Sequence, residues 1–393
     1  MKHRSLVIGI FIFLAAGLMF GQTWDHMKRL TYTSGITRGV KVARGWGDVV
    51  HVVWSDDISG NFEIYYKNCG GGGTETWSAP VRLTWNSGQS DSPDIIVDPS
   101  GYVHVVWIDN TPGNDEIYHK FTYDNGITWS APIRVTWTSG GSQDVSIAAS
   151  SNSWIRMAYR EYKELDTEIH YKEYNPGTGT WSAPVRLTYT SGFATNPWIG
   201  VDGQGTIGGN IHVIWEDDSV GNKELYHKLS TDNGDNWSLV HRITYTSGDS
   251  QKPCFVFTSN DMLRLIYYDN TVGNHEIYYK ERYPDTGNWG GLRRLTWTSA
   301  ASLQPTIAAD INDDIHVVYA DRTPGVYDLY HKKSTDGGNN WSAVTRITWS
   351  WSNSHWARMV VSESDNHIHL VYIDESPGNS ECYFKRGNQT AIY

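Results

Sequence analysis

Residues 77–85 read WSAPVRLTW, and versions of this stretch return every 52 to 56 residues along the chain. Its last three residues have seven copies, namely Leu30-Thr31-Tyr32, Leu83-Thr84-Trp85, Val135-Thr136-Trp137, Leu187-Thr188-Tyr189, Ile243-Thr244-Tyr245, Leu295-Thr296-Trp297 and Ile347-Thr348-Trp349. A period near 50 residues with no helical signal is typical of β-propeller blades, each a four-stranded sheet. We therefore predict an all-β, seven-bladed β-propeller of four-stranded blades, with repeat units starting near residues 30, 83, 135, 187, 243, 295 and 347.

The second unit shows where the four strands of a blade are expected. They are residues 93–97, 102–107, 116–120 and 129–137, separated by turn sequences rich in Asp, Asn, Pro and Gly. Apolar and polar residues mix along these strands without a one-sided alternation. This pattern favours blades that pack against neighbours on both faces.

The first and last repeats indicate how the ring closes. Six units carry a Trp and an Arg five residues apart on the fourth strand, namely Trp77/Arg82, Trp129/Arg134, Trp181/Arg186, Trp237/Arg242, Trp289/Arg294 and Trp341/Arg346. The seventh unit ends before its own copy, and the missing pair lies near the start of the chain as Trp24 and Arg29. We predict that this N-terminal strand completes the last blade and leaves no open edge. Residues 22–393 then form one propeller domain.

The N-terminus resembles a secretory signal peptide. Lys2, His3 and Arg4 form a basic start, followed by a short apolar run. We predict a signal peptide over residues 1–21, with cleavage near Gly21, and a secreted protein without a membrane span after its removal. An uncleaved anchor is the alternative.

Charge and cysteine content exclude some functions. The formal net charge is −11, so a polyanion such as nucleic acid is not expected as a partner. The three cysteines, Cys69, Cys254 and Cys382, lie in different repeats at unrelated positions and suggest no disulfide framework. We expect no metal and no cofactor, and a monomer.

Three turns between the third and fourth strands read Ser/Thr-x-Asp-x-Gly-x-x-Trp. Their aspartates are Asp124, Asp232 and Asp336. This pattern resembles the Asp-box of BNR-repeat proteins, a sialidase-like superfamily that includes sialidases and non-catalytic propellers, and the resemblance covers essentially the whole chain after residue 21. It implies that these turns lie on the face opposite a sialidase active site and that the three aspartates are structural. Other turns are degraded, and the first unit has a glycine run at residues 70–73 instead.

Several charged positions recur in every unit. We interpret them as structural, because a group that is present in all seven blades is expected to have the same role in each blade. A carboxylate follows the second strand, at Asp56, Asp109, Glu161, Asp217, Asp269, Asp321 and Asp374. A second carboxylate opens the third strand, for example Glu63, with a Lys four residues later. We predict that the first caps loop N–H groups and that the second pairs with such a Lys, either within its own blade or in the next one. The recurring histidines of the second strand, His51, His104, His212, His316 and His369, are interpreted as structural rather than as a metal site.

A ligand site should break the repeat symmetry, so the variable residues around the first strands are the candidates. They frame one axial mouth of the propeller, together with the loops between second and third strands. The predicted ligand-binding residues are Arg38, Asp91, Asp94, Asp144, Asn196, Trp198, Lys252, Gln304, His355, Trp356 and Arg358. The alternative is that these loops bind nothing, lie in solvent and are free to vary in sequence.

Three functions remain open on the sequence. The first is a non-catalytic module that binds an extracellular glycan, with Trp198 and Trp356 as flat faces for sugar rings. The second is a sialidase-like exo-glycoside hydrolase, in which Arg38, Arg322 and Arg358 would hold a carboxylate, although no Tyr–Glu nucleophile pair can be assigned. The third is a scaffold for a surface protein.

Overall fold

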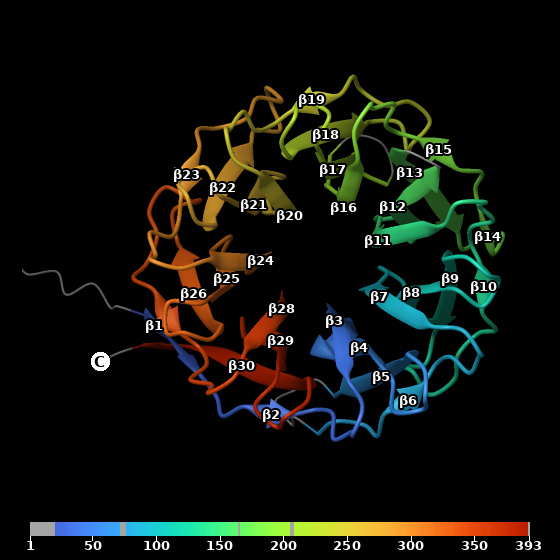
Figure 1. The fold of residues 1–393 in the computed structure, drawn as a ribbon, viewed down its shortest axis with the longest axis horizontal. Helices are drawn as coiled ribbons and strands as arrows, with labels where there is room; N and C mark the ends of the chain where they lie inside the picture. Colours follow the sequence, from blue (N-terminus) through green and yellow to red (C-terminus); the bar gives the residue numbers. More distant parts are fainter. Residues whose placement is uncertain (1–19, 71–75, 164–165, 205–207, 392–393) are drawn as a thin grey trace, which may run out of the picture.

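The strands form seven blades around a central axis, as predicted (Figure 1). A computed structural model of the chain describes residues 20–70, 76–163, 166–204 and 208–391. The predicted signal peptide lies outside these residues except for its last two positions, and most of the glycine run lies outside them as well. Within the described residues, helical structure is limited to one 3-10 turn, η1 (Trp46–Asp48).

Each blade is antiparallel, with its first strand nearest the axis (Figure 1). The innermost strands of blades 1 to 7 are β3 (Thr37–Arg44), β7 (Ser90–Val97), β11 (Ser142–Ala149), β16 (Ala194–Val201), β20 (Ser250–Phe257), β24 (Ser302–Ala309) and β28 (Ser354–Val361). The second strands are β4 (Val50–Asp56), β8 (Val103–Asp109), β12 (Ile155–Lys163), β17 (Ile211–Asp217), β21 (Leu263–Asp269), β25 (Ile315–Asp321) and β29 (Ile368–Asp374). Four of these, β4, β17, β21 and β25, are buried at every position, because neighbouring blades cover both of their faces.

The two outer layers complete each blade. The third strands are β5 (Glu63–Cys69), β9 (Glu116–Thr122), β13 (Asp166–Asn175), β18 (Glu224–Ser230), β22 (Glu276–Arg282), β26 (Asp328–Ser334) and β30 (Glu381–Ala391). The outermost strands are β6 (Val81–Arg82), β10 (Ile133–Arg134), β14 (Thr180–Trp181) with β15 (Val185–Arg186), β19 (His241–Arg242), β23 (Arg293–Arg294) and β27 (Thr345–Arg346). In blade 7 the outer position is filled by β1 (Phe20–Trp24) and β2 (Lys28–Arg29), both paired with β30. The predicted closure of the ring by the N-terminal strand is therefore confirmed.

The outermost strands are much shorter than the predicted 129–137 segment of blade 2. Pro132 has no N–H, and only Ile133 and Arg134 form ladder pairs with β9. Elsewhere side-chain hydroxyls replace backbone carbonyls as acceptors: Ser130 Oγ accepts from the N–H of Phe121 at 3.1 Å, and Thr136 Oγ1 accepts from that of Ile117 at 2.8 Å. The repeated Ser and Thr thus keep the strand attached while its backbone leaves the ladder.

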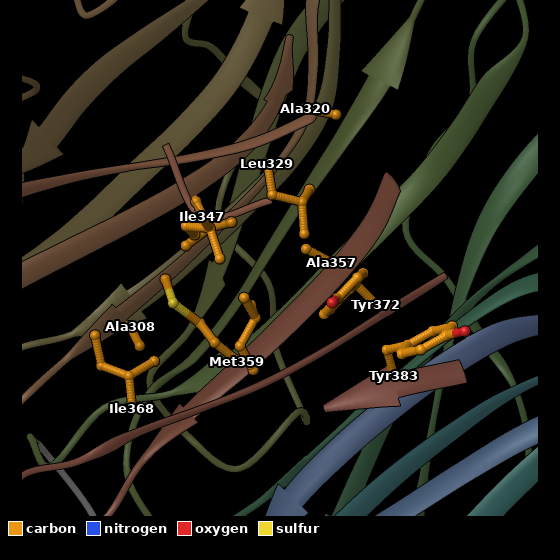
Figure 2. Close-up of a cluster of buried hydrophobic side chains, with 11 residues drawn as sticks. Ala308, Ala320, Leu329, Ile347, Ala357, Met359, Ile368, Tyr372 and Tyr383 are labelled. Atoms are coloured by element: carbon orange, nitrogen blue, oxygen red, sulfur yellow. The ribbon is translucent and has the colours of Figure 1, made fainter. Parts of the chain in front are cut away.

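The core of the described residues consists of seven apolar clusters, one between each pair of neighbouring blades. The cluster between blades 6 and 7 contains Met359 and Ile368 from one blade and Leu329 and Ile347 from the other (Figure 2). Since every blade faces two such clusters, stability is shared around the closed ring.

The recurring carboxylates are structural, but one predicted partner is wrong. Glu116 pairs with Arg134 of the outermost strand at 3.1 Å, not with Lys120. Residues four apart on an extended strand are about 13 Å apart, too far for an ion pair. Lys120 instead donates to the carbonyl of Leu83 in the preceding blade at 2.7 Å. The Glu/Asp–Arg pair recurs in all seven blades.

Candidate functional site

A β-bulge interrupts each innermost strand near the upper mouth, the axial mouth framed by the loops between second and third strands. At each bulge one residue has positive φ, between 49° and 64°. The seven residues are Gly39, Ser92, Asp144, Asn196, Lys252, Gln304 and Trp356. Six of them are not glycine, and left-handed backbone at such residues costs of order 1 kcal/mol or more each. Strain at six of the seven bulges, each with a different side chain, marks this level of the channel as the candidate site.

Seven of the predicted ligand-binding residues line one cavity of about 130 Å³ at this level. They are Asp144, Asn196, Trp198, Lys252, Gln304, Trp356 and Arg358. The cavity is small because side chains cross the axis: Lys41 Nζ of blade 1 lies 5.7 Å from the ring centre of Trp198 in blade 4. The upper mouth is therefore a shallow site closed from below by its own side chains.

Two cations line this cavity without a carboxylate partner among the described residues. Arg358 Nη1 donates to the carbonyl of Ala357 at 2.8 Å, and its Nε has no hydrogen-bond partner. Removal from water lowers the pKa of Arg358, an effect that Cys254 and Asp94 partly oppose. Lys252 Nζ donates to the side-chain carbonyl of Asn196, and burial lowers its pKa, a shift that the charges of Glu216 and Asp144 partly oppose. Unpaired cations in a partly dehydrated cavity attract an anion.

The neighbouring charges are paired. Lys41 binds Asp94 at 2.9 Å across blades 1 and 2, and Asp94 also accepts from the N–H of Ile147. Arg160 Nε binds Asp144 at 3.0 Å. The cavity therefore carries a net positive charge although the chain as a whole is acidic.

The sequence analysis assigned no site role to Glu216, to Arg160 or to Tyr268, which lies on β21. All three occupy the second-strand position just before the recurring carboxylate, where the other blades have Ser55, Ile108, Ala320 and Ile373. Glu216 is fully buried, accepts from the N–H of Lys252 at 2.7 Å and binds Lys223 at 3.0 Å. The variation at this position was a signal that could have found them.

A groove of about 230 Å³ adjoins the cavity and shares Gln304 and Trp356 with it. In this groove His355 Nε2 lies 3.2 Å from Glu375 Oε1. Burial lowers the pKa of His355, while the Glu375 charge opposes that shift. Arg322 lies at the groove's edge, with its guanidinium 5.9 Å from the ring centre of Tyr327.

Arg38 and Asp91 lie outside the cavity. They form an ion pair with each other. The guanidinium carbon of Arg38 also lies 3.5 Å from the ring centre of Phe62. The cavity contains Arg358 but neither Arg38 nor Arg322, so the arginine trio of the hydrolase hypothesis does not gather there.

The opposite mouth holds a larger cavity of about 740 Å³, which the sequence did not indicate. Three of its four charged residues join blade 7 to blade 1: Arg44 pairs with Asp48 and Glu363, and Asp48 accepts from the N–H of Glu363 at 3.0 Å. Hydrogen bonds hold the pKa of Asp48 at about 2 despite its burial, which acts the other way.

The three Ser/Thr-x-Asp turns lie on this same face, because they join third to fourth strands. Asp124 accepts hydrogen bonds within its own turn from Thr122 Oγ1 at 2.7 Å and from the N–H of Thr128 at 2.9 Å. Asp232 and Asp336 make the equivalent bonds to Ser230 and Asn236, and to Ser334 and Asn340. These contacts agree with the structural role that was predicted for the three aspartates.

The recurring histidines lie inside the blades. His104 and His119, His212 and His227, and His316 and His331 form buried pairs with N–N distances of 3.0 to 3.1 Å. Within the described parts of the chain, no cluster of three His, Cys, Asp or Glu side chains could hold a metal ion.

Comparisons with known proteins show the fold. No family model and no curated protein sequence matches the chain. Among solved structures, an ulvan lyase of polysaccharide lyase family PL25 matches with a TM-score of 0.62 at 12% identity, covering 91% of this chain and 95% of the other. The intramolecular trans-sialidase from Ruminococcus gnavus matches with 0.53 at 12%, covering 93% and 98%. A protein of unknown function from Dyadobacter fermentans matches with 0.58 at 10%, covering 94% and 100%. The chain thus shares its β-propeller fold with sialidase-like proteins at low sequence identity.

Proposed function

We propose that this chain is a secreted, non-catalytic propeller that binds an acidic extracellular glycan at the upper axial mouth. The observation that carries the proposal is the pair of cations, Lys252 and Arg358, that line one cavity with no carboxylate partner among the described residues. In a chain of net charge −11, two unpaired cations at one point favour a ligand that brings its own carboxylate or sulfate.

The other walls of the cavity suit a sugar. Trp356 is 40% exposed and Trp198 is half-buried, so both present part of an aromatic face to the cavity. Asn196 and Gln304 add amide groups that can exchange hydrogen bonds with hydroxyls. Among the neighbours, the ulvan lyase is described as bound to -[GlcA(1-4)Rha3S]-, which by analogy supports a saccharide ligand.

Binding without turnover is proposed because Tyr268 and Glu216, which precede the recurring carboxylates of blades 5 and 4, are poorly suited to catalysis. Burial raises the pKa of Tyr268, and the charge of Glu216 raises it further, which makes the phenol a weaker nucleophile. Glu216 is already occupied by Lys223 and by the N–H of Lys252.

Secretion and a monomeric state belong to the same proposal. No helix in the described part of the chain is long and apolar enough to cross a membrane. Cleavage after Gly21 would leave Gln22–Trp24 of β1 paired with β30. N-terminal sequencing of the exported protein should begin at Gln22, and its mass in solution should be that of one chain.

The test is a glycan array probed with residues 22–393 and read both for retained protein and for loss of terminal sialic acid. We expect retention on glycans that carry carboxylate or sulfate groups and no release of sialic acid. Release would replace the proposal with the hydrolase, and a blank array would favour a protein partner.

Variants locate the site. Arg358→Met and Trp356→Ala should each weaken binding at least tenfold, whereas Arg38→Met, which removes an arginine paired outside the cavity, should not. Unchanged binding by Arg358→Met would contradict the proposed site.

A further inference from the structure

The third residue of the repeated Leu-Thr-Trp motif is exposed in every blade. The preceding Leu83 and Thr84 are 1% and 4% exposed, but Trp85 is 67% exposed. The same holds for Tyr32, Trp137, Tyr189, Tyr245, Trp297 and Trp349, which are exposed between 68% and 78%. Packing of the blades explains the buried residues of the motif, but it does not explain seven exposed aromatic rings.

Each exposed ring is supported by the arginine of the recurring ion pair. The guanidinium carbon lies between 4.3 and 5.8 Å from the ring centre in all seven copies. That arginine is itself held by the buried carboxylate of the third strand, for example Arg82 by Glu63. The arginine and its buried carboxylate therefore hold the exposed aromatic ring in a fixed position.

Beside the exposed ring, two further rings complete a pocket in the outer rim. In blade 2 these are Trp107 of β8 and Tyr118 of β9, which stack 5.9 Å apart. Stacked pairs at the same place occur in all seven blades, at 5.6 to 6.1 Å, with Tyr159 and His170 in blade 3.

Two of these positions are hollowed into equivalent cavities. One, of about 300 Å³, is lined by Trp85, Trp107, Tyr118, Asn86 and Thr111 among others. The other, of about 290 Å³, is lined by Tyr189, Trp215, Tyr226, Thr190 and Ser219 among others. Pockets of this size with aromatic walls and a few hydroxyl or amide groups are typical of small-ligand sites.

The two charged residues that line the blade 2 pocket, Lys120 and Asp109, have opposite signs, and each is hydrogen-bonded within the protein. Arg82 is bound by Glu63, Lys120 donates to the carbonyl of Leu83, and Asp109 accepts from the N–H of Thr111 at 2.9 Å. The pockets therefore favour an uncharged ligand, in contrast to the upper mouth.

We infer that the outer rim carries repeated sites for neutral pyranose units, one at each blade junction, and that the protein binds such glycans multivalently. The apolar face of a pyranose stacks on the exposed ring, and its hydroxyls meet groups such as Thr111 and Asn86. Weak single sites gain avidity when several engage one glycan chain or one surface. This inference does not rest on the proposed function of the upper mouth.

The first test observes the tryptophan indole N–H signals by NMR. Methyl pyranosides of glucose, galactose, mannose, fucose and N-acetylglucosamine are the probes, and Trp→Phe variants assign the signals. At least one probe should shift the signals of Trp85 and Trp215 but not that of Trp46, a 68%-exposed indole of η1 at the opposite mouth. The inference is overturned if none of the five shifts Trp85 or Trp215 at about 50 mM, well above a millimolar dissociation constant.

The second test measures binding to a polymer that displays the active sugar. The double variant Trp85→Ala/Tyr189→Ala should bind it about tenfold or more weakly, whereas Trp46→Ala at the opposite mouth and the upper-mouth variant Trp356→Ala should bind like the parent protein. A lower melting temperature for the double variant with unchanged polymer binding would show instead that the rings only shield the arginines. Loss of polymer binding in Trp356→Ala alone would assign the sugar to the mouth.

Discussion

The backbone N–H of Lys252 donates a 2.7 Å hydrogen bond to Oε1 of Glu216, a fully buried carboxylate in the neighbouring blade. Lys252 has φ of 51° at the bulge of its strand. The bulge takes this N–H out of the ladder, and Glu216 supplies the replacement acceptor. One buried side chain thus helps to hold a cation of the candidate site in place.

Glu216→Ala should therefore destabilise the protein by about 3 kcal/mol, because it removes the acceptor for this N–H and the partner of Lys223. Steric misfit is not the reason, since blade 6 has Ala320 at the same position. Urea unfolding would measure the loss. Glu216→Gln, which keeps one acceptor oxygen, should lose less, and equal stability of Glu216→Ala and the parent would contradict this role.

Replacement of Trp356 by glycine and by alanine should separate strain from ligand binding. Both changes remove the indole from the cavity, so both should weaken glycan retention. Because φ is 54°, the glycine variant should be the more stable of the two by about 1 kcal/mol. Thermal unfolding of the two proteins gives the comparison, and a more stable alanine variant would argue against strain at the bulge.

Ring closure should depend on Arg29, which binds the buried Glu381 352 residues away along the chain. Arg29→Met should cost about 3 kcal/mol, because it leaves a buried carboxylate without its cation. Arg134→Met, the equivalent change inside blade 2, is the matched variant and should cost a similar amount. Deletion of residues 22–31 should go further and abolish cooperative unfolding, since β30 would expose an open edge.

Acid should destabilise the protein through its buried histidines. Burial lowers the pKa of His51 and of His369 to about 4, and lowers that of His119, His227 and His331 well below the usual value. These groups stay neutral when folded and take up protons on unfolding, so their contribution is present above pH 6.5 and is lost as the pH falls toward 4. Each should add about 1.4 kcal/mol per pH unit to the slope in that window.

Unfolding midpoints in urea between pH 7.5 and 4.5 measure this slope. His369→Phe should make it shallower, because it removes one buried titrating group beside Phe384. An unfolding midpoint in the parent protein that does not change with pH would show that the histidines are solvated.

Thiol reagents should not reach the cysteines of the folded protein. Cys69, Cys254 and Cys382 are buried and form no disulfide, and burial raises the pKa of Cys254 to about 11. A colorimetric thiol assay should count none before unfolding and three after. Early reaction of Cys254, which lines the upper cavity, would mean that the channel opens.

The repeat made much of the fold predictable. The seven Leu-Thr-Trp/Tyr copies fixed the number of blades, and the missing Trp/Arg pair located the closing strand. The fourth strands were predicted too long, because a sequence pattern does not distinguish a ladder carbonyl from the hydroxyl of Ser130 or Thr136 that replaces it. The Glu116–Lys120 pairing failed because the nearest opposite charge, on Arg134, comes from another strand.

The candidate site was predictable only as a set of variable positions. Trp198, Lys252, Trp356 and Arg358 do line one cavity, but Arg38 and Asp91 satisfy each other outside it. Which charges remain unpaired depends on contacts between blades, and no spacing in the sequence reports those contacts.

The amino-acid sequence by itself determined the blade, the blade count and the closure of the ring, because periodic burial and turn residues act locally and repeat. The tertiary structure alone decided that Lys252 and Arg358 share a cavity and that seven aromatic rings remain exposed on the rim. These facts depend on the closed circle of blades (Figure 1). The circle brings side chains of different blades into one cavity and leaves other side chains exposed.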